Sequence, residues 1–138
     1  MAELVGDSLD AFLEHYGALL WSPGHKVDCC LCLAEWAIWQ GHEDPAARFR
    51  GTYSSDEEFR QIIRQSGVVP LLTECARSIG ASPTQAPRRG DVGVIGSTRN
   101  ALHQFGAIHD GRGWVVRQKQ GLGRMSARVL AAWSLPTK

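Results

Sequence analysis

The order of apolar and polar residues divides the chain into two parts with different periodicity. Through about residue 81, apolar residues recur every three or four positions, which is the spacing of amphipathic helices. A first helix is expected at 8–19, because it carries an apolar stripe of Leu9, Phe12, Leu13, Tyr16 and Leu19. A second is expected from Cys29 to about Gln40, because Asp28 is suited to cap it and Gly41 to end it.

Two further helices and one short one follow from local capping signals. An Asp-Pro pair at 44–45 is typical of a cap followed by the first helical position, so a short helix is expected there. The capping box at 55–58 precedes a helix that Gly67 should close. Pro70 is expected to open the next helix, which runs to Ile79.

After the Pro- and Arg-containing segment at 82–90, the pattern becomes that of short strands. We expect strands at 91–95, 102–108 and 113–118 and a closing strand at 132–135, with one helical turn within 124–131. Asp110-Gly111 is a hairpin signal. The sequence therefore predicts an α+β fold in a single domain, 1–138, with a helical part at about 1–81 and a β-sheet part at about 90–135.

Length and charge narrow the function classes. The chain has 138 residues, a net charge of +1 and 21% charged residues, a balance that gives no reason to expect a nucleic-acid partner. No apolar run approaches the roughly 20 residues of a membrane span, and the start MAELVGDSLD lacks the features of a signal peptide. We therefore expect no membrane insertion and a cytoplasmic protein when synthesised.

Three of the four cysteines lie within four positions, at 29, 30 and 32, and the fourth is Cys75. Such spacing does not suit a secreted disulfide framework, so free thiols are expected, without a cofactor or metal. Cys29 is the candidate nucleophile because it would open a helix, where the unpaired N–H groups and the helix dipole favour a thiolate.

Three local motifs resemble papain-like cysteine peptidases, in particular the NlpC-like branch that cleaves bacterial cell-wall peptides. Asp28-Cys29 before an apolar helix is similar to the nucleophile motif of that branch. The segments 89–95 (RGDVGVI) and 105–111 (FGAIHDG) resemble its first two strands, the second of which carries the general-base histidine. The resemblance spans 21–118 and implies a papain-like fold of the NlpC type.

A second resemblance concerns Trp36, the segment 44–53 (DPAARFRGTY) and Trp133. These residues resemble a small family encoded in the tail modules of phages and prophages, whose members are thought to be NlpC-like in fold. This second resemblance implies tail-tip proteins as partners and incorporation into a phage or phage-like particle, and the NlpC-like resemblance implies peptidoglycan peptides as partners.

In the NlpC-like pattern, the base stands directly before the pair aligned with Phe105-Gly106, and that position is Gln104. His103 comes one residue earlier, and neighbouring side chains of a strand point to opposite faces. A β-bulge at the start of the strand would turn the side chain of His103 to the face that contacts Cys29. Without one, Gln104 faces the sulfur and can orient a substrate or donate to an oxyanion but cannot act as a base.

Further candidates surround this pair. Asp28 and Gln118 are candidates for orienting the substrate or the base, and His25 and Trp114 for lining the site. Cys29 and Cys32 also form a Cys-x-x-Cys at a helix start, which is the spacing of thiol redox proteins.

Two functions remain open at this stage. One is a pseudoenzyme that serves as a structural or assembly component of a tail tip. The other is an active cysteine hydrolase in which Cys29 attacks a peptide bond of peptidoglycan and His103 shuttles the proton.

Overall fold

The computed structural model describes residues 3–137, with side chains from Ser8 onward. Helices occupy the first part of the chain: α1 (Glu3–Gly17), α2 (Leu31–Trp39), α3 (Asp56–Ser66) and α4 (Val68–Ser78). Strands follow: β1 (Ser82–Pro83), β2 (Val92–Gly96), β3 (Gln104–His109), β4 (Trp114–Gln118), β5 (Gly121–Met125) and β6 (Val129–Ser134), with a 3-10 turn, η1 (Ala101–His103), before β3. The predicted α+β class is confirmed.

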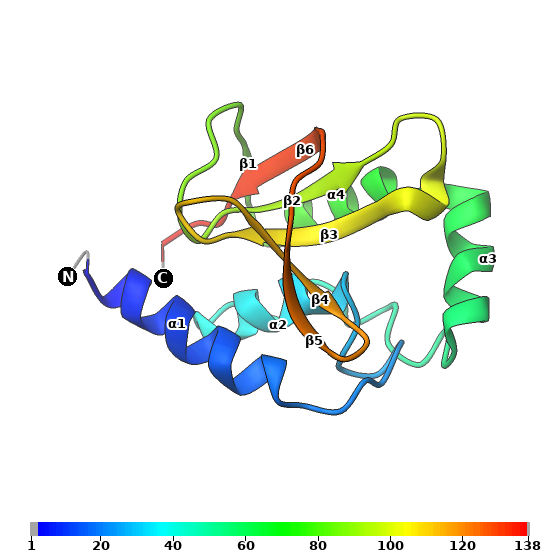
Figure 1. Ribbon diagram of the computed structural model, residues 1–138, viewed down its shortest axis with the longest axis horizontal. Helices are drawn as coiled ribbons and strands as arrows, with labels where there is room; N and C mark the ends of the chain where they lie inside the picture. The colour runs from blue at the N-terminus through cyan, green and yellow to red at the C-terminus, as the bar shows by residue number, and fades with distance from the viewer. Residues whose placement is uncertain (1–2, 138) are drawn as a thin grey trace.

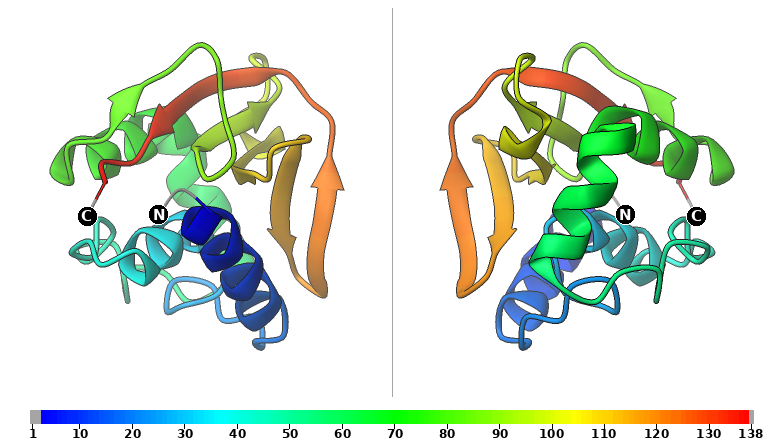
Figure 2. Two further views of the ribbon diagram at one scale, coloured as in Figure 1. Left: turned by 90° about the vertical axis from the view of Figure 1, so that its left-hand side faces the viewer. Right: turned by 90° about the vertical axis from the view of Figure 1, so that its right-hand side faces the viewer.

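The six strands form one antiparallel sheet in the order β1-β6-β2-β3-β4-β5. The sheet is strongly curved: β6 runs across its top and the β4–β5 hairpin hangs from one side (Figure 2). Strands β3 and β4 pair at two positions, Ile108 with Val115 and His109 with Trp114, whereas β4 and β5 pair along their whole length. The hairpin therefore diverges from β3, toward the helices.

Helices α1, α2 and α4 pack against one face of the sheet, the face that carries Val92, Ile108 and Trp133. Helix α2 lies between α1 and β3, and α4 lies behind β2, β3 and β6 (Figure 1). The core between them is held by buried side chains of all these elements: Leu9, Phe12 and Tyr16 of α1, Leu33 and Trp36 of α2, Leu72 and Ala76 of α4, and Val92, Val94, Ile108 and Trp133 of the sheet. Burial of this apolar surface is the main force that holds α2 against β3.

A second, smaller core fills the concave face of the sheet. Trp114 is 7% exposed, and its ring lies over Gly93, where an added Cβ would come within 2.9 Å of the ring. Glycine in this strand is thus required by the close approach of the indole. Ile95, Ala107, Val116 and Ala132 complete the cluster.

Two expected elements are absent from the described structure. Residues 45–51 form turns rather than a helix, although Asp44 does accept a hydrogen bond from the N–H of Ala46 at 3.0 Å. The helical turn expected within 124–131 is also wrong, because that stretch holds the end of β5 and the start of β6. Helix α4 starts at Val68, two residues earlier than expected, so Pro70 lies in its first turn, where a missing N–H breaks no helical hydrogen bond.

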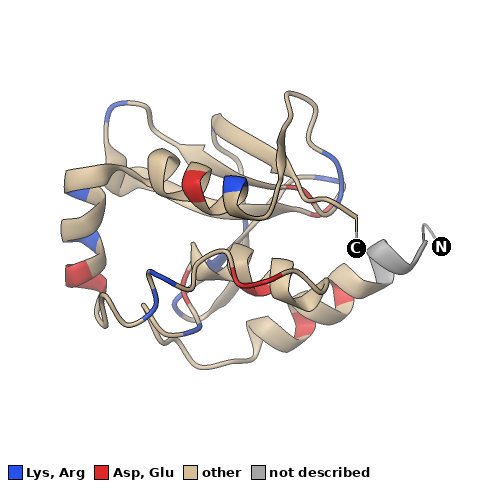
Figure 3. Cartoon of the chain, turned by 180° about the vertical axis from the view of Figure 1, so that it is seen from behind, with Lys and Arg blue, Asp and Glu red and all other residues tan. Residues whose placement is uncertain are grey.

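Acidic and basic residues are interspersed over the helices and loops (Figure 3). Three of the ion pairs among the described residues join two exposed side chains: Arg48 with Glu74, and Glu57 of α3 with both Arg60 and Arg64. No helix within residues 3–137 is both long and apolar enough to cross a membrane.

Candidate functional site

Asp28 caps α2 and sets the position of Cys29. Its Oδ1 accepts hydrogen bonds from the N–H groups of Cys30 at 3.0 Å and Leu31 at 2.7 Å. Its carbonyl accepts from the N–H of Cys32 at 3.0 Å, the first bond of the helical ladder. This is N-cap geometry, so Cys29 occupies the first turn as the sequence predicted, although the regular helix begins at Leu31.

The other carboxylate oxygen of Asp28 holds the surrounding loops. Oδ2 accepts from the N–H of Gly24 at 3.0 Å and from the hydroxyl of Tyr53 at 2.6 Å. Gly24 has a positive φ of 79°, and an added Cβ would lie 1.7 Å from the carbonyl oxygen of Tyr53, so only glycine fits. Burial, together with the charge of Asp28, raises the pKa of Tyr53, which therefore remains a hydrogen-bond donor.

Arg50 fastens the same two loops from outside. Its guanidinium contacts Asp44 at 2.6 Å and Glu35 of α2 at 2.8 Å, and it donates to the carbonyl of His25 at 2.8 Å. Although partial burial opposes the shift, the hydrogen bonds from Arg50 and from Ala46 lower the pKa of Asp44. The side chain of His25 is exposed, so His25 takes part in this contact only through its backbone carbonyl.

Strand β3 passes directly beneath Cys29. An added Cβ on Gly106 would lie 2.7 Å from the carbonyl oxygen of Cys29 and 3.2 Å from the Cα of Cys30. Side chains alternate along a strand, so Gln104 projects from the same face as Gly106, about 7 Å further along at a rise of about 3.3 Å per residue. The predicted facing of Gln104 toward Cys29 is in keeping with this register.

His103 lies outside this arrangement. It is the last residue of η1, it is exposed, and its Nδ1 lies 3.5 Å from the Nδ2 of Asn100. Its carbonyl accepts from the N–H of Ser97 at 3.0 Å, which closes the loop before β3. The pairing of β2 with β3 is continuous from Ile108 to Gln104, so no bulge in this pairing turns His103 toward Cys29.

The half-buried side chain of Cys29 borders a cavity of about 300 Å³ in the gap between β3, α3 and the β4–β5 hairpin. Gln104 lines the cavity, with its Nε2 donating to the carbonyl of Ser97 at 2.9 Å, and so does Gln118 of β4. Much of the wall is apolar: Trp21, Pro23, Phe59, Ile63, Leu102, Phe105, Val116 and Met125. The residues that line it include neither His103 nor His25, and Trp114 is packed in the second core instead.

The neighbouring thiols differ from Cys29 in their surroundings. The Sγ atoms of Cys29 and Cys30 lie 3.9 Å apart. The hydrogen bond to Cys29, together with burial, raises the pKa of Cys30, so its thiol stays protonated and is suited to donate to Cys29. Cys32 is 2% exposed within the main core, and burial raises its pKa, which leaves the second position of the Cys-x-x-Cys sequence without solvent access.

The chain matches, over residues 4–135, the family described as a domain of unknown function, DUF6950. It belongs to that family. The match covers both the helices and the sheet, so Cys29, Gln104 and Gln118 all lie within the family's domain. No curated protein and no solved structure matches the chain significantly.

Within this family domain, the cavity combines a thiol at a helix N-terminus with two amide side chains, and it is also lined by the charged residues Asp28, Asp56, Arg60, Arg117 and Lys119. A neutral amide donates and accepts hydrogen bonds but does not take up a proton near neutral pH. The Asp28 carboxylate accepts four hydrogen bonds, from three backbone N–H groups and from the hydroxyl of Tyr53. Its role is therefore to hold the loop in position. Among residues 3–137, no three His, Cys, Asp or Glu side chains converge as a metal site would require.

Two residues of the site were missed by sequence reasoning. Tyr53 contacts Asp28 across 25 positions, and nothing in the surrounding loop sequence signals that contact. Arg50 lies in a loop whose sequence has no pattern that marks an ion-pair bridge, yet it contacts both Asp44 and Glu35. Because both contacts are set by tertiary folding, neither gives rise to a local pattern.

Proposed function

We propose that the chain is a papain-like protein of the NlpC type that serves as a structural or assembly component of a phage or prophage tail tip, and that its Cys29 site does not hydrolyse peptides. The observation that carries this proposal is which side chain lies on the Cys29 face of β3. The strand position on the Gly106 face holds Gln104, while His103 is exposed beside Asn100. Cysteine hydrolysis needs a base within hydrogen-bond reach of the thiol, and an amide does not supply one.

The resemblance of the sequence motifs supports the NlpC assignment, and the order of elements agrees with it. A cysteine in the first turn of an early helix packs on the second strand of an antiparallel meander, β2-β3-β4. The tail association rests on the second resemblance, which concerns Trp36, the segment 44–53 and Trp133. In this assignment the Cys29 cavity serves as a binding surface, where Gln104 and Gln118 offer amide groups to a polar partner.

Reactivity of Cys29 tests the site directly. Alkylation by iodoacetamide at pH 6, mapped to Cys29 by peptide mass spectrometry, should proceed at the same rate in the wild type and in His103→Ala. Gln104→His should raise the rate roughly tenfold, because an imidazolium facing the sulfur favours the thiolate by about one pKa unit or more. A several-fold loss of rate in His103→Ala would show instead that His103 activates the thiol, and would contradict the proposal.

Two further measurements separate the structural function from an active hydrolase. Incubation with purified peptidoglycan peptides should give the same products with the wild type and with Cys29→Ala. Release of amino groups by the wild type alone would establish the alternative, a cysteine hydrolase centred on Cys29. For the tail assignment, the protein should be found by mass spectrometry in purified phage particles, and its absence from them would reject that assignment.

A further inference from the structure

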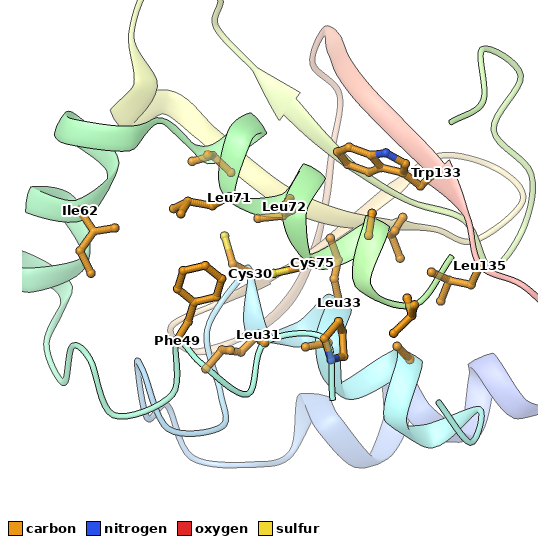
Figure 4. A pocket seen from close by; sticks show the side chains of 18 of the residues that line it. Cys30, Leu31, Leu33, Phe49, Ile62, Leu71, Leu72, Cys75, Trp133 and Leu135 are labelled. Carbon is orange, nitrogen blue, oxygen red and sulfur yellow. The ribbon is translucent and has the colours of Figure 1, made fainter. Parts of the chain in front are cut away.

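A second cavity, of about 80 Å³, lies on the other side of the α2 N-terminus from the Cys29 site. It is enclosed by α2, α3, α4 and the loop at 45–53, with Trp133 and Leu135 at one end (Figure 4). One water molecule needs about 10–15 Å³, so the space holds roughly five or more water-sized spheres. That is the size of a short alkyl chain.

The walls of this cavity favour an apolar occupant. No side chain that lines it is charged at neutral pH, and aliphatic and aromatic side chains predominate, such as Leu33, Phe49 and Leu71. The hydroxyl of Tyr53 is already bound to Asp28. Cys30 and Cys75 add two sulfurs to the wall (Figure 4), and burial raises the pKa of the Cys75 thiol, so it stays uncharged. Water gains few hydrogen bonds in such a space, whereas an apolar group gains dispersion contacts.

The cavity adjoins a charged groove at the surface. Cys75 and Pro45 line both the cavity and an open groove of about 530 Å³, whose other walls include Arg48, Glu74 and Arg77. The Glu74 carboxylate is paired with Arg48. Within the described part of the chain Arg77 makes no ion pair, and its side chain is exposed.

The second acidic residue of the groove is also engaged, since Asp44 contacts Arg50 at 2.6 Å. The cation that remains available to a ligand at the groove is therefore Arg77. An apolar cavity whose mouth opens beside such a cation is complementary to a molecule with an alkyl chain and an anionic head.

We propose that the apolar cavity and the adjoining groove bind a short-chain carboxylate, with its alkyl chain between α2, α3 and α4 and its carboxylate at Arg77. This site is separate from the Cys29 cavity and does not depend on the function proposed for it. Cys75 stands at the junction of the two parts, where the chain of the ligand would pass. The ligand class follows from the apolar walls and from the unengaged cation.

Hexanoate and 1-hexanol form a pair of probes with the same six-carbon chain, and only hexanoate carries a negatively charged head. In calorimetric titrations, both should bind to the full chain at one site, with hexanoate the tighter. Arg77→Gln should weaken hexanoate binding about three- to tenfold and leave hexanol binding unchanged. Arg64→Gln, on an exposed arginine of α3 outside the groove, is the control and should change neither.

A second variant and a second signal locate the ligand. Cys75→Phe places a ring in the junction and should abolish binding of both probes. Of the five tryptophans, Trp133 lines the cavity, so 6-bromohexanoate should quench part of the tryptophan emission as it saturates the site. The proposal is overturned if neither probe binds, if Arg77→Gln affects the two probes equally, or if the protein responds to phosphatidylglycerol vesicles but not to free hexanoate. Because Arg77 is exposed, its variant decides the matter even where Cys75→Phe fails to fold.

Discussion

Replacing Asp28 with alanine should destabilise the fold by about 4 kcal/mol. The substitution removes the cap of α2, which is worth about 1 kcal/mol. It also leaves the hydroxyl of Tyr53 and the N–H of Gly24 without their acceptor, and an unsatisfied buried donor costs about 1–3 kcal/mol. With Asp28 only 1% exposed, water does not readily replace the lost oxygens.

The loss is measurable by urea denaturation followed by tryptophan fluorescence, as a lower midpoint with an unchanged slope. Native domains are stable by about 5–15 kcal/mol, so the variant should still fold, with a melting temperature lower by roughly 10–16 °C. Tyr53→Phe removes one of the four donors and should cost less than half as much. Asp10→Ala, which breaks an exposed pair with Arg89, is the control and should cost about 0–1 kcal/mol.

A loss below about 1.5 kcal/mol in Asp28→Ala would refute the reasoning. It would mean that the loops around Gly24 and Tyr53 relax and find water, so that Asp28 does not fix the position of Cys29. A large loss in Tyr53→Phe together with a small one in Asp28→Ala would refute it as well. In that case packing of the Tyr53 ring, rather than the carboxylate network, would stabilise the two loops.

Two other substitutions test the sheet. Gly106→Ala should cost about 1–3 kcal/mol in urea denaturation, because its Cβ forces β3 away from Cys29, whereas Gly113→Ala meets only the flexible end of Arg124 at 3.4 Å and should be tolerated. Equal effects of the two would contradict the close approach at Gly106. The hydrogen bond from Arg124 lowers the pKa of Asp110, so this carboxylate stabilises the fold above about pH 4 and less as the pH falls below that. Asp110→Asn should therefore cost about 1 kcal/mol at pH 7 and less at pH 2.5, and a difference independent of pH would count against the ion pair.

Elements with a local signal were predicted well from the sequence. The capping box of α3 forms: the Oγ of Ser55 accepts from the N–H of Glu58 at 3.1 Å. The hairpin signal is also correct, because the Oδ1 of Asp110 accepts from the N–H groups of Arg112 and Gly113 at 2.9 and 3.0 Å. Each of these signals depends on side chains within three positions of the backbone they bind, so sequence alone suffices.

Elements held by distant contacts were missed. Strand β5 reads GLGRM, which has no β-branched residue, and it is a strand because it pairs with β4. The short helix expected after Asp44 gives way to turns, and the contacts of Arg50 with Asp44 and with Glu35 of α2 hold that loop across the domain. In both places tertiary pairing decides the conformation, which explains why local propensity failed.

The candidate site falls between these two cases. Alternation along a strand anticipated that Gln104 and not His103 would lie on the Cys29 face, and Gly106 fixes that register by contact with the Cys29 carbonyl. The alternation of side chains does not predict what holds Cys29 in place. Cys29 is held by the hydrogen bonds of Tyr53 and Gly24 to the Asp28 carboxylate. A network that holds the thiol so firmly, beside an amide instead of a base, is stabilising in its own right. The network therefore stabilises the fold whether or not Cys29 is catalytic, and only a base placed on the Cys29 face of β3, as in Gln104→His, would turn the same support into an activated thiol.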